Sequence, residues 1–128
     1  MAWVIWMKRW DAVGYRVALK LYRTAFRMQP ELAEITASDN RVYNAACVAA
    51  LAGEQDQALD WLRKDLAYLE SIEGDDSYDG GRLRRSLAHR MVDPDLVSVR
   101  DRDDLSEAWR EYWTEVEAFL ARLKEGAK

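Results

Sequence analysis

Apolar residues recur at three- and four-residue steps through three long stretches of the chain, the spacing that places side chains on one face of an α-helix. These stretches span residues 11–28, 56–72 and 103–126. The first must end before Pro30, because the residue that precedes a proline is excluded from helical backbone angles. The last ends near Gly126, a favourable residue just after a helix. The chain therefore has three amphipathic helices that need neighbours to bury their apolar faces.

The apolar face of the first helix is expected to run along one stripe. The stripe contains Val17, Leu21, Ala25 and Met28, with Ala18, Tyr22 and Phe26 beside it. Trp61, Trp109 and Trp113 fall on the corresponding stripes of the other two long helices and are predicted to be core residues.

Shorter helices are predicted in the intervals, at 40–52, at 82–91 and as one turn at 96–99. Ser38 or Asp39 can cap the first of them by accepting a hydrogen bond from its free N–H groups. No alternating β-branched run bounded by turn residues occurs in the sequence, so no sheet is expected. The predicted fold class is all-α.

Composition limits the possible functions. A chain of 128 residues is long enough for one domain, and 49% hydrophobic with 33% charged residues is typical of a soluble globular protein. The net charge of −4 argues against general binding to nucleic acid or to an anionic membrane. The apolar run at 2–7 is too short to span a membrane and lacks the features of a signal peptide. We therefore expect a cytoplasmic protein.

Candidate catalytic chemistry is sparse. The single cysteine, Cys47, lies in the alanine-rich segment "YNAACVAALAG", where a thiol is expected to pack as a small apolar group. The single histidine, His89, stands in a basic stretch with no sequence signal for a carboxylate to orient it, and a Cys–His pair usually needs such a group. The sequence predicts no catalytic residue and no enzyme. A small Cys/His enzyme would require rapid reaction of Cys47 with thiol reagents.

Acidic pairs also invite a metal-site interpretation, but none has the spacing of a calcium loop. Asp93-Pro94-Asp95 is better interpreted as a turn with a helix N-cap. We expect no metal site and no cofactor.

One spacing pattern indicates a repeat protein. Ala18, Tyr22, Ala25 and Pro30 follow one another at steps of four, three and five residues, and this pattern resembles the second helix of a tetratricopeptide repeat. Small Ala46 and Ala58, with Gly53 between them, resemble the next helical pair. The ordered segments "YNAAC", "ALDWLRKDL" and "DPDLVSVRD" resemble the tetratricopeptide-rich C-terminal region of large bacterial multidomain proteins, many of which carry an upstream Ser/Thr kinase domain.

The resemblance covers about residues 10–123 and implies an antiparallel array of helix hairpins. We expect a single domain over 1–128, with a degenerate first repeat at 1–30, a second repeat at 39–72, and C-terminal helices at 79–126 that end in a long capping helix. Asp65 stands where such repeats usually have a small residue. No kinase motif is present, so kinase activity is not implied. The chain begins inside a repeat-like helix, and the sequence leaves open whether it is a whole gene product or a piece of a longer protein.

The resemblance also implies a function, namely binding of a protein or peptide partner in a concave groove lined by the first helix of each pair. Asn40, Tyr43, Asn44 and Cys47 would face that groove. An Asn side chain can pair with both the N–H and the C=O of an extended peptide. Some family members hold a C-terminal carboxylate with Asn and basic residues, and only the Asn is matched here. Alternatively, Asn44 bonds to a neighbouring helix or loop.

Arg84 and Arg85 are further candidates for partner binding. With Arg82 and Arg90 they form the densest basic patch of the chain, which can bind a phosphate or an acidic peptide through guanidinium contacts. The acidic residues within 73–79 favour the alternative that the patch pairs internally.

The first ten residues hold three tryptophans, among them Trp3 and Trp6. Three indoles exceed the apolar surface that one short helix normally buries, so they either cover a partner or a second copy of the chain, or pack on Tyr15, Val17 and Leu21. The alternative function is therefore a structural module that forms homo-oligomers through Trp3 and Trp6.

Overall fold

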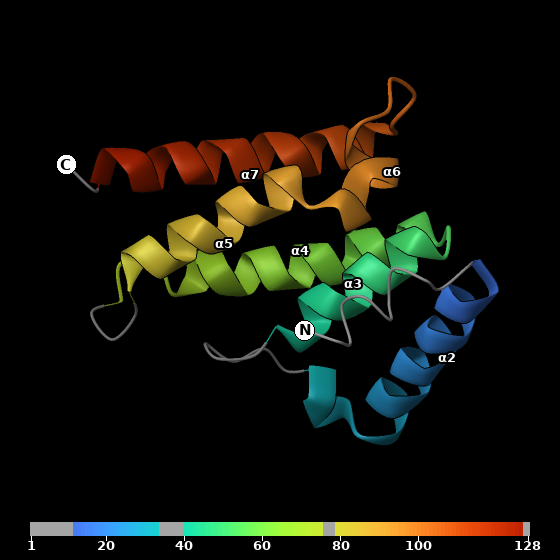
Figure 1. Cartoon of the computed structure of the whole chain (residues 1–128). Coiled ribbons are helices and arrows are strands. Elements are labelled where there is room, and N and C mark those ends of the chain that lie inside the picture. Colours follow the sequence, from blue (N-terminus) through green and yellow to red (C-terminus); the bar gives the residue numbers. More distant parts are fainter. Residues whose placement is uncertain (1–11, 34–39, 76–78, 127–128) are drawn as a thin grey trace.

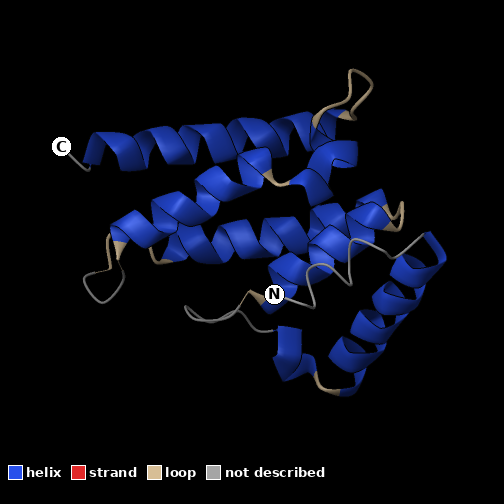
Figure 2. Ribbon diagram, viewed as in Figure 1, coloured by secondary structure: helices blue, strands red, loops and turns tan. Residues whose placement is uncertain are grey.

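A computed structural model describes residues 12–33, 40–75 and 79–126 of the chain (Figure 1). The helical elements, in chain order, are α2 (Ala12–Met28), η1 (Pro30–Ala33), α3 (Arg41–Leu51), α4 (Gln55–Ser71), α5 (Gly80–Val92), η2 (Pro94–Leu96), α6 (Val97–Arg100) and α7 (Glu107–Gly126). Figure 2 shows no strand within these ranges. The predicted all-α class is confirmed for this part of the chain, in which no helix is long and apolar enough to cross a membrane.

The helix boundaries follow local chemistry. Helix α2 ends at Met28, before Pro30, as predicted. Helix α7 begins at Glu107 rather than at 103, because the Ser106 hydroxyl accepts a hydrogen bond from the Trp109 N–H at 3.3 Å and so caps the helix. The predicted caps of α3, Ser38 and Asp39, lie outside the described residues.

Helices α3 and α4 form a hairpin around Gly53, whose φ of 82° favours glycine. The Glu54 N–H donates to the Ala49 carbonyl at 2.9 Å, and the Gly53 N–H donates to the Ala50 carbonyl at 3.1 Å. These two bonds satisfy carbonyls that the end of α3 would otherwise leave free. The turn returns the chain so that α4 lies along α3 (Figure 1).

Helix α3 is the centre of the fold, with eight of its eleven residues buried. It packs against α2 on one side and α4 on the other. Ala46 on α3 and Ala58 on α4 are both fully buried. Small side chains at buried positions allow helices to approach closely.

Helix α7 closes the other side of the bundle against α4 and α5 (Figure 1). Tyr112, Val116 and Phe119 are fully buried along its inner face. The Trp113 indole N–H donates to the Val99 carbonyl at 2.8 Å and so ties α7 to α6. The predicted core positions of Trp61, Trp109 and Trp113 are confirmed.

Helix α2 packs through a different face from the one expected. Its inner side consists of Ala18, Leu19, Tyr22 and Phe26, and the Phe26 ring meets the Trp61 ring edge to face at 5.5 Å. The predicted stripe is largely exposed, since Val17 is 56% and Leu21 65% exposed. Periodicity shows that a helix has an apolar side, but α2 is apolar over so wide an arc that periodicity does not select which part packs on α3.

Candidate functional site

A buried arginine joins four helices of the bundle. Arg90 on α5 donates from Nη2 to Asp65 Oδ2 on α4 at 2.6 Å, and from Nη1 to the Tyr112 hydroxyl on α7 at 3.0 Å. Its guanidinium lies over the ring of Tyr43 on α3, 5.0 Å from the centroid. Burial disfavours the charged form, but Tyr112 and the Asp65 carboxylate outweigh it and raise the pKa of Arg90 above its ordinary value. Arg90 is therefore a buried, charged side chain that connects α5 to α3, α4 and α7 in the core.

The position of Arg90 corrects the prediction that it is a surface residue, and it explains why an aspartate stands at position 65. Arg90 was assigned to a surface patch, yet it is only 1% exposed. Asp65, which departs from the repeat pattern, is its buried partner. The two residues are 25 positions apart, so local sequence gives no signal that they meet.

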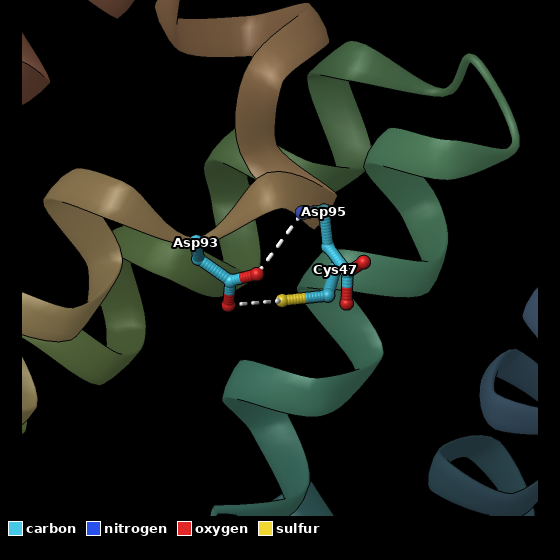
Figure 3. A group of neighbouring side chains, drawn as sticks. All are labelled: Cys47, Asp93 and Asp95. Atoms are coloured by element: carbon cyan, nitrogen blue, oxygen red, sulfur yellow. Dashed lines mark hydrogen bonds between the residues drawn. The ribbon is translucent and has the colours of Figure 1, made fainter. Parts of the chain in front are cut away.

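A second cluster surrounds the Asp93 carboxylate, just after α5. Its Oδ2 accepts from the Tyr43 hydroxyl at 2.7 Å and from Cys47 Sγ at 3.8 Å, and its Oδ1 accepts from the Asp95 N–H at 3.0 Å. Figure 3 shows the Cys47 sulfur directed toward Asp93. The predicted turn and N-cap at Asp93 are confirmed, because the Asp95 bond caps η2.

Arg100 closes the segment that carries this cluster. Its Nη1 donates to the carbonyl oxygens of Arg90 at 3.0 Å and Asp93 at 2.9 Å. Its other guanidinium nitrogens bind the Asp101 carboxylate. The connection from α5 to α6 is thus held in one conformation by hydrogen bonds at both ends.

The arrangement does not create a nucleophile. A reactive cysteine needs a thiolate and a base in contact with the sulfur. Burial, followed by the charges of Asp93 and Asp95, raises the pKa of Cys47. His89 Nε2 lies 3.3 Å from the same Asp93 oxygen that accepts from the thiol, so a carboxylate rather than the imidazole contacts the sulfur. Its negative charge opposes formation of a thiolate.

The carboxylate beside His89 was missed in the sequence. Its signal was the spacing, because Asp93 follows His89 by four residues on one helical face.

The same cluster contains a set of potential metal ligands. The ligand atoms of Cys47, Asp93 and Asp95 lie within 4.8 Å of one another. However, both Asp93 oxygens already accept hydrogen bonds from the protein, and the raised pKa of Cys47 keeps its proton in place. The cluster therefore serves as a set of hydrogen bonds that joins α3 to the end of α5.

Cys47 should therefore react with a disulfide reagent at least about 100-fold more slowly in the folded protein than in denaturant, because the thiol is 4% exposed and its pKa is raised. The rate of colour release from an aromatic disulfide measures this, with the denatured chain as the control. Rapid reaction of the folded protein would show an accessible thiolate and contradict the structural role.

The structure divides the predicted partner-binding residues of α3 into two groups. Asn40 and Asn44 are exposed, whereas Tyr43 and Cys47 are buried. The expectation that Tyr43 offers surface to a partner is therefore wrong, since its hydroxyl is held by Asp93. The alternative for Asn44 is also not observed, because its side chain makes no hydrogen bond to any residue in the described ranges.

Tyr43 places the exposed residues of α3 beside those of α5. Its ring lies 6.4 Å from the His89 ring, centroid to centroid. His89 is exposed, and Arg85 lies one turn earlier on the same side of α5. Asn40 and Asn44 on α3 and Arg85 and His89 on α5 are exposed, and these four residues of the two helices that this ring contact joins are named here the α3–α5 surface.

The side chains of Arg84 and Arg85 have different surroundings. Arg85 Nη2 lies 4.0 Å from an Asp79 carboxylate oxygen, so the predicted pairing with the acidic segment is confirmed for that residue. Arg84 instead lines a pocket of about 370 Å³ at the end of the bundle. The other lining residues are Glu73, Gly74, Gly80, Gly81, Arg122 and Leu123.

The remaining candidates, Trp3 and Trp6, lie outside the described residues. None of the protein families, curated proteins or solved structures compared with this chain matches it. The resemblance to tetratricopeptide repeats therefore stays a prediction.

Proposed function

We propose that this chain is a non-catalytic protein-interaction module of the tetratricopeptide type, which binds an extended peptide segment of a partner across the α3–α5 surface. The observation that carries the proposal is Asn44. It is an exposed amide on a helix that is otherwise mostly buried, and it makes no side-chain hydrogen bond within the described ranges. An Asn in that state can pair with the N–H and C=O of a peptide group at once.

Charge on the same surface favours an acidic peptide. The ion pair of Arg85 with Asp79 is long, at 4.0 Å, and both side chains are more than two-thirds exposed. Exposed pairs of this kind contribute little free energy, so the guanidinium can exchange Asp79 for a partner carboxylate. A peptide carboxylate at Arg85 and a backbone contact at Asn44 would fix the direction of the bound segment.

Buried hydrogen bonds hold in place the helices that carry the α3–α5 surface. The Asp93 carboxylate bonds to Tyr43 on α3, while Arg90 joins α5 to α4 and α7. A surface held rigid before binding loses less conformational entropy when a peptide docks. In this proposal the α3–α4 hairpin is the second repeat, and the C-terminal helices follow it, with α7 as the long capping helix.

Peptides selected from a random library on the whole protein test this proposal. We expect Asn44→Ala and Arg85→Ala each to weaken a selected peptide by about tenfold in a fluorescence anisotropy titration. Lys64→Ala is the matched control, because it removes an exposed charge of the same sign on α4. If the selected peptides bind both variants as tightly as the unmodified protein, the α3–α5 surface is not the binding site.

A further inference from the structure

Helix α2 has a second apolar side that packs on nothing in the described ranges. Four large apolar side chains are 56% or more exposed: Val13, Val17, Leu21 and Met28. They follow one another at steps of four, four and seven residues and so form one line along the helix. This line is named here the outer stripe.

The outer stripe is a concentrated feature. It contains four of the six large apolar side chains that are exposed in the described ranges. Gly14 and Ala25, both half-buried, lie along its edge, between the stripe and the side that faces α3. Small residues in that place allow the backbone of a second helix to come close to α2.

A row of positive charge accompanies the stripe on its other edge. Arg16 and Lys20 are exposed and follow Val13 and Val17 by three positions. Arg27 is also exposed and follows Thr24, which lies on the same line between Leu21 and Met28, by three positions. Helix α2 contains no acidic residue. None of the three forms an ion pair with a residue in the described ranges; the fourth basic residue, Arg23, instead contacts Glu54 and Gln57 on or near α4. Arg16, Lys20 and Arg27 are named here the basic row.

We propose that α2 docks an amphipathic α-helix of a partner protein, with its apolar face on the outer stripe and acidic side chains opposite the basic row. The shape fits a helix, because the stripe is straight, runs from Val13 to Met28 and is bordered by small residues. The charge fits an acidic flank, because opposite charges across an interface guide association and exclude partners of like charge.

Charge also argues against two other occupants, a second copy of α2 and the chain's own first residues. Two copies of α2 packed antiparallel through the stripe would bring the two basic rows to the same side of the contact, which is unfavourable. The first ten residues of the chain carry Lys8 and Arg9 and no acidic residue, so they offer nothing to the basic row. This docking site shares no residue with the α3–α5 surface, and either proposal can fail without the other.

A synthetic helical peptide of the same length as α2 is the probe. It carries leucines at positions i, i+3, i+4 and i+7 with glutamates beside them, and its control peptide has lysines in place of the glutamates. By fluorescence anisotropy with the whole protein, we expect the glutamate peptide to bind at least about tenfold more tightly. Leu21→Gln should weaken the glutamate peptide by about tenfold, because it places an amide in the centre of the apolar contact.

Charge reversal separates this docking from loss of folding. Lys20→Glu together with Arg27→Glu should invert the preference so that the lysine peptide binds more tightly. Lys64→Glu, an exposed reversal on α4, should leave the preference unchanged. Equal binding of the two peptides by the unmodified protein would overturn the proposal.

Three further results would overturn it by identifying another occupant. Binding to vesicles of anionic lipid that Leu21→Gln abolishes, without binding to the glutamate peptide, would assign the face to a membrane surface. A mass that doubles with concentration and returns to one chain in Leu21→Gln would assign it to a second copy. Absence of glutamate-peptide binding by the unmodified protein, with binding gained after Trp3→Ala and Trp6→Ala, would show that the chain's own first residues cover the stripe.

Discussion

Replacing Arg90 by methionine should lower the free energy of unfolding by about 3–5 kcal/mol, the largest effect we expect from any single substitution in this chain. Arg90→Met removes the positive partner of Asp65, whose side chain is only 7% exposed. The carboxylate would remain in the core without its counter-charge, and desolvation of an unpaired charge is costly. Urea denaturation followed by circular dichroism measures the change.

A second substitution identifies the cause. Asp65→Leu combined with Arg90→Met replaces the ion pair by apolar side chains, and it should restore stability to within about 1 kcal/mol of the unmodified protein or above it. If the double variant is as unstable as Arg90→Met alone, the loss comes from packing around the guanidinium rather than from the unpaired charge. A loss below about 1 kcal/mol in Arg90→Met would show that Asp65 gains access to water.

Ala46→Leu should destabilise the fold by about 1–3 kcal/mol, because Ala46 is fully buried on α3, the helix that packs against both α2 and α4. Ala46 and Ala58 are both 0% exposed in this contact. Insertion of three extra carbon atoms must push the two helices apart or force side chains off their preferred rotamers. Thermal melting and urea denaturation both report the change.

Ala118→Leu is the matched control for Ala46→Leu. It makes the same substitution at an exposed position of α7, where a larger side chain meets water instead of a neighbouring helix. Its effect should stay within about 0.5 kcal/mol. Equal losses in the two variants would show that leucine acts through helix propensity, and the close approach of α3 and α4 would not be the reason for the alanines.

The elements of this fold could be predicted from sequence because their signals are local. Helical spacing located all the long helices, Pro30 marked the end of α2, and Gly53 marked the turn of the α3–α4 hairpin. The start of α7 was misplaced by four residues, since acidic Asp103 and Asp104 resemble a helix start as much as Ser106 does. The hydroxyl contact at Ser106 decides between them, and only the folded backbone shows it.

The interior polar groups could not be predicted in the same way. Tyr43 and Asp93 bond across 50 positions, and Asp65 and Arg90 across 25. Charged residues are usually exposed, so Arg90 in a run of arginines was assigned to the surface. Asn44 and Tyr43 are neighbours in sequence, yet Asn44 is exposed and Tyr43 is buried, so the expectation that both face a partner fails for Tyr43.

Arg90 has a consequence for how the molecule loses its structure. Arrays of helix pairs contact only their neighbours, and their units can therefore open one after another. Here a single side chain bonds to or lies against α3, α4 and α7 from its position on α5. If any of these helices unfolds by itself, the buried charge of Arg90 loses part of its surroundings. Residues 41–126 should thus melt as one cooperative unit, while α2, fastened mainly to α3, is free to open at lower cost and to exchange its amide protons first.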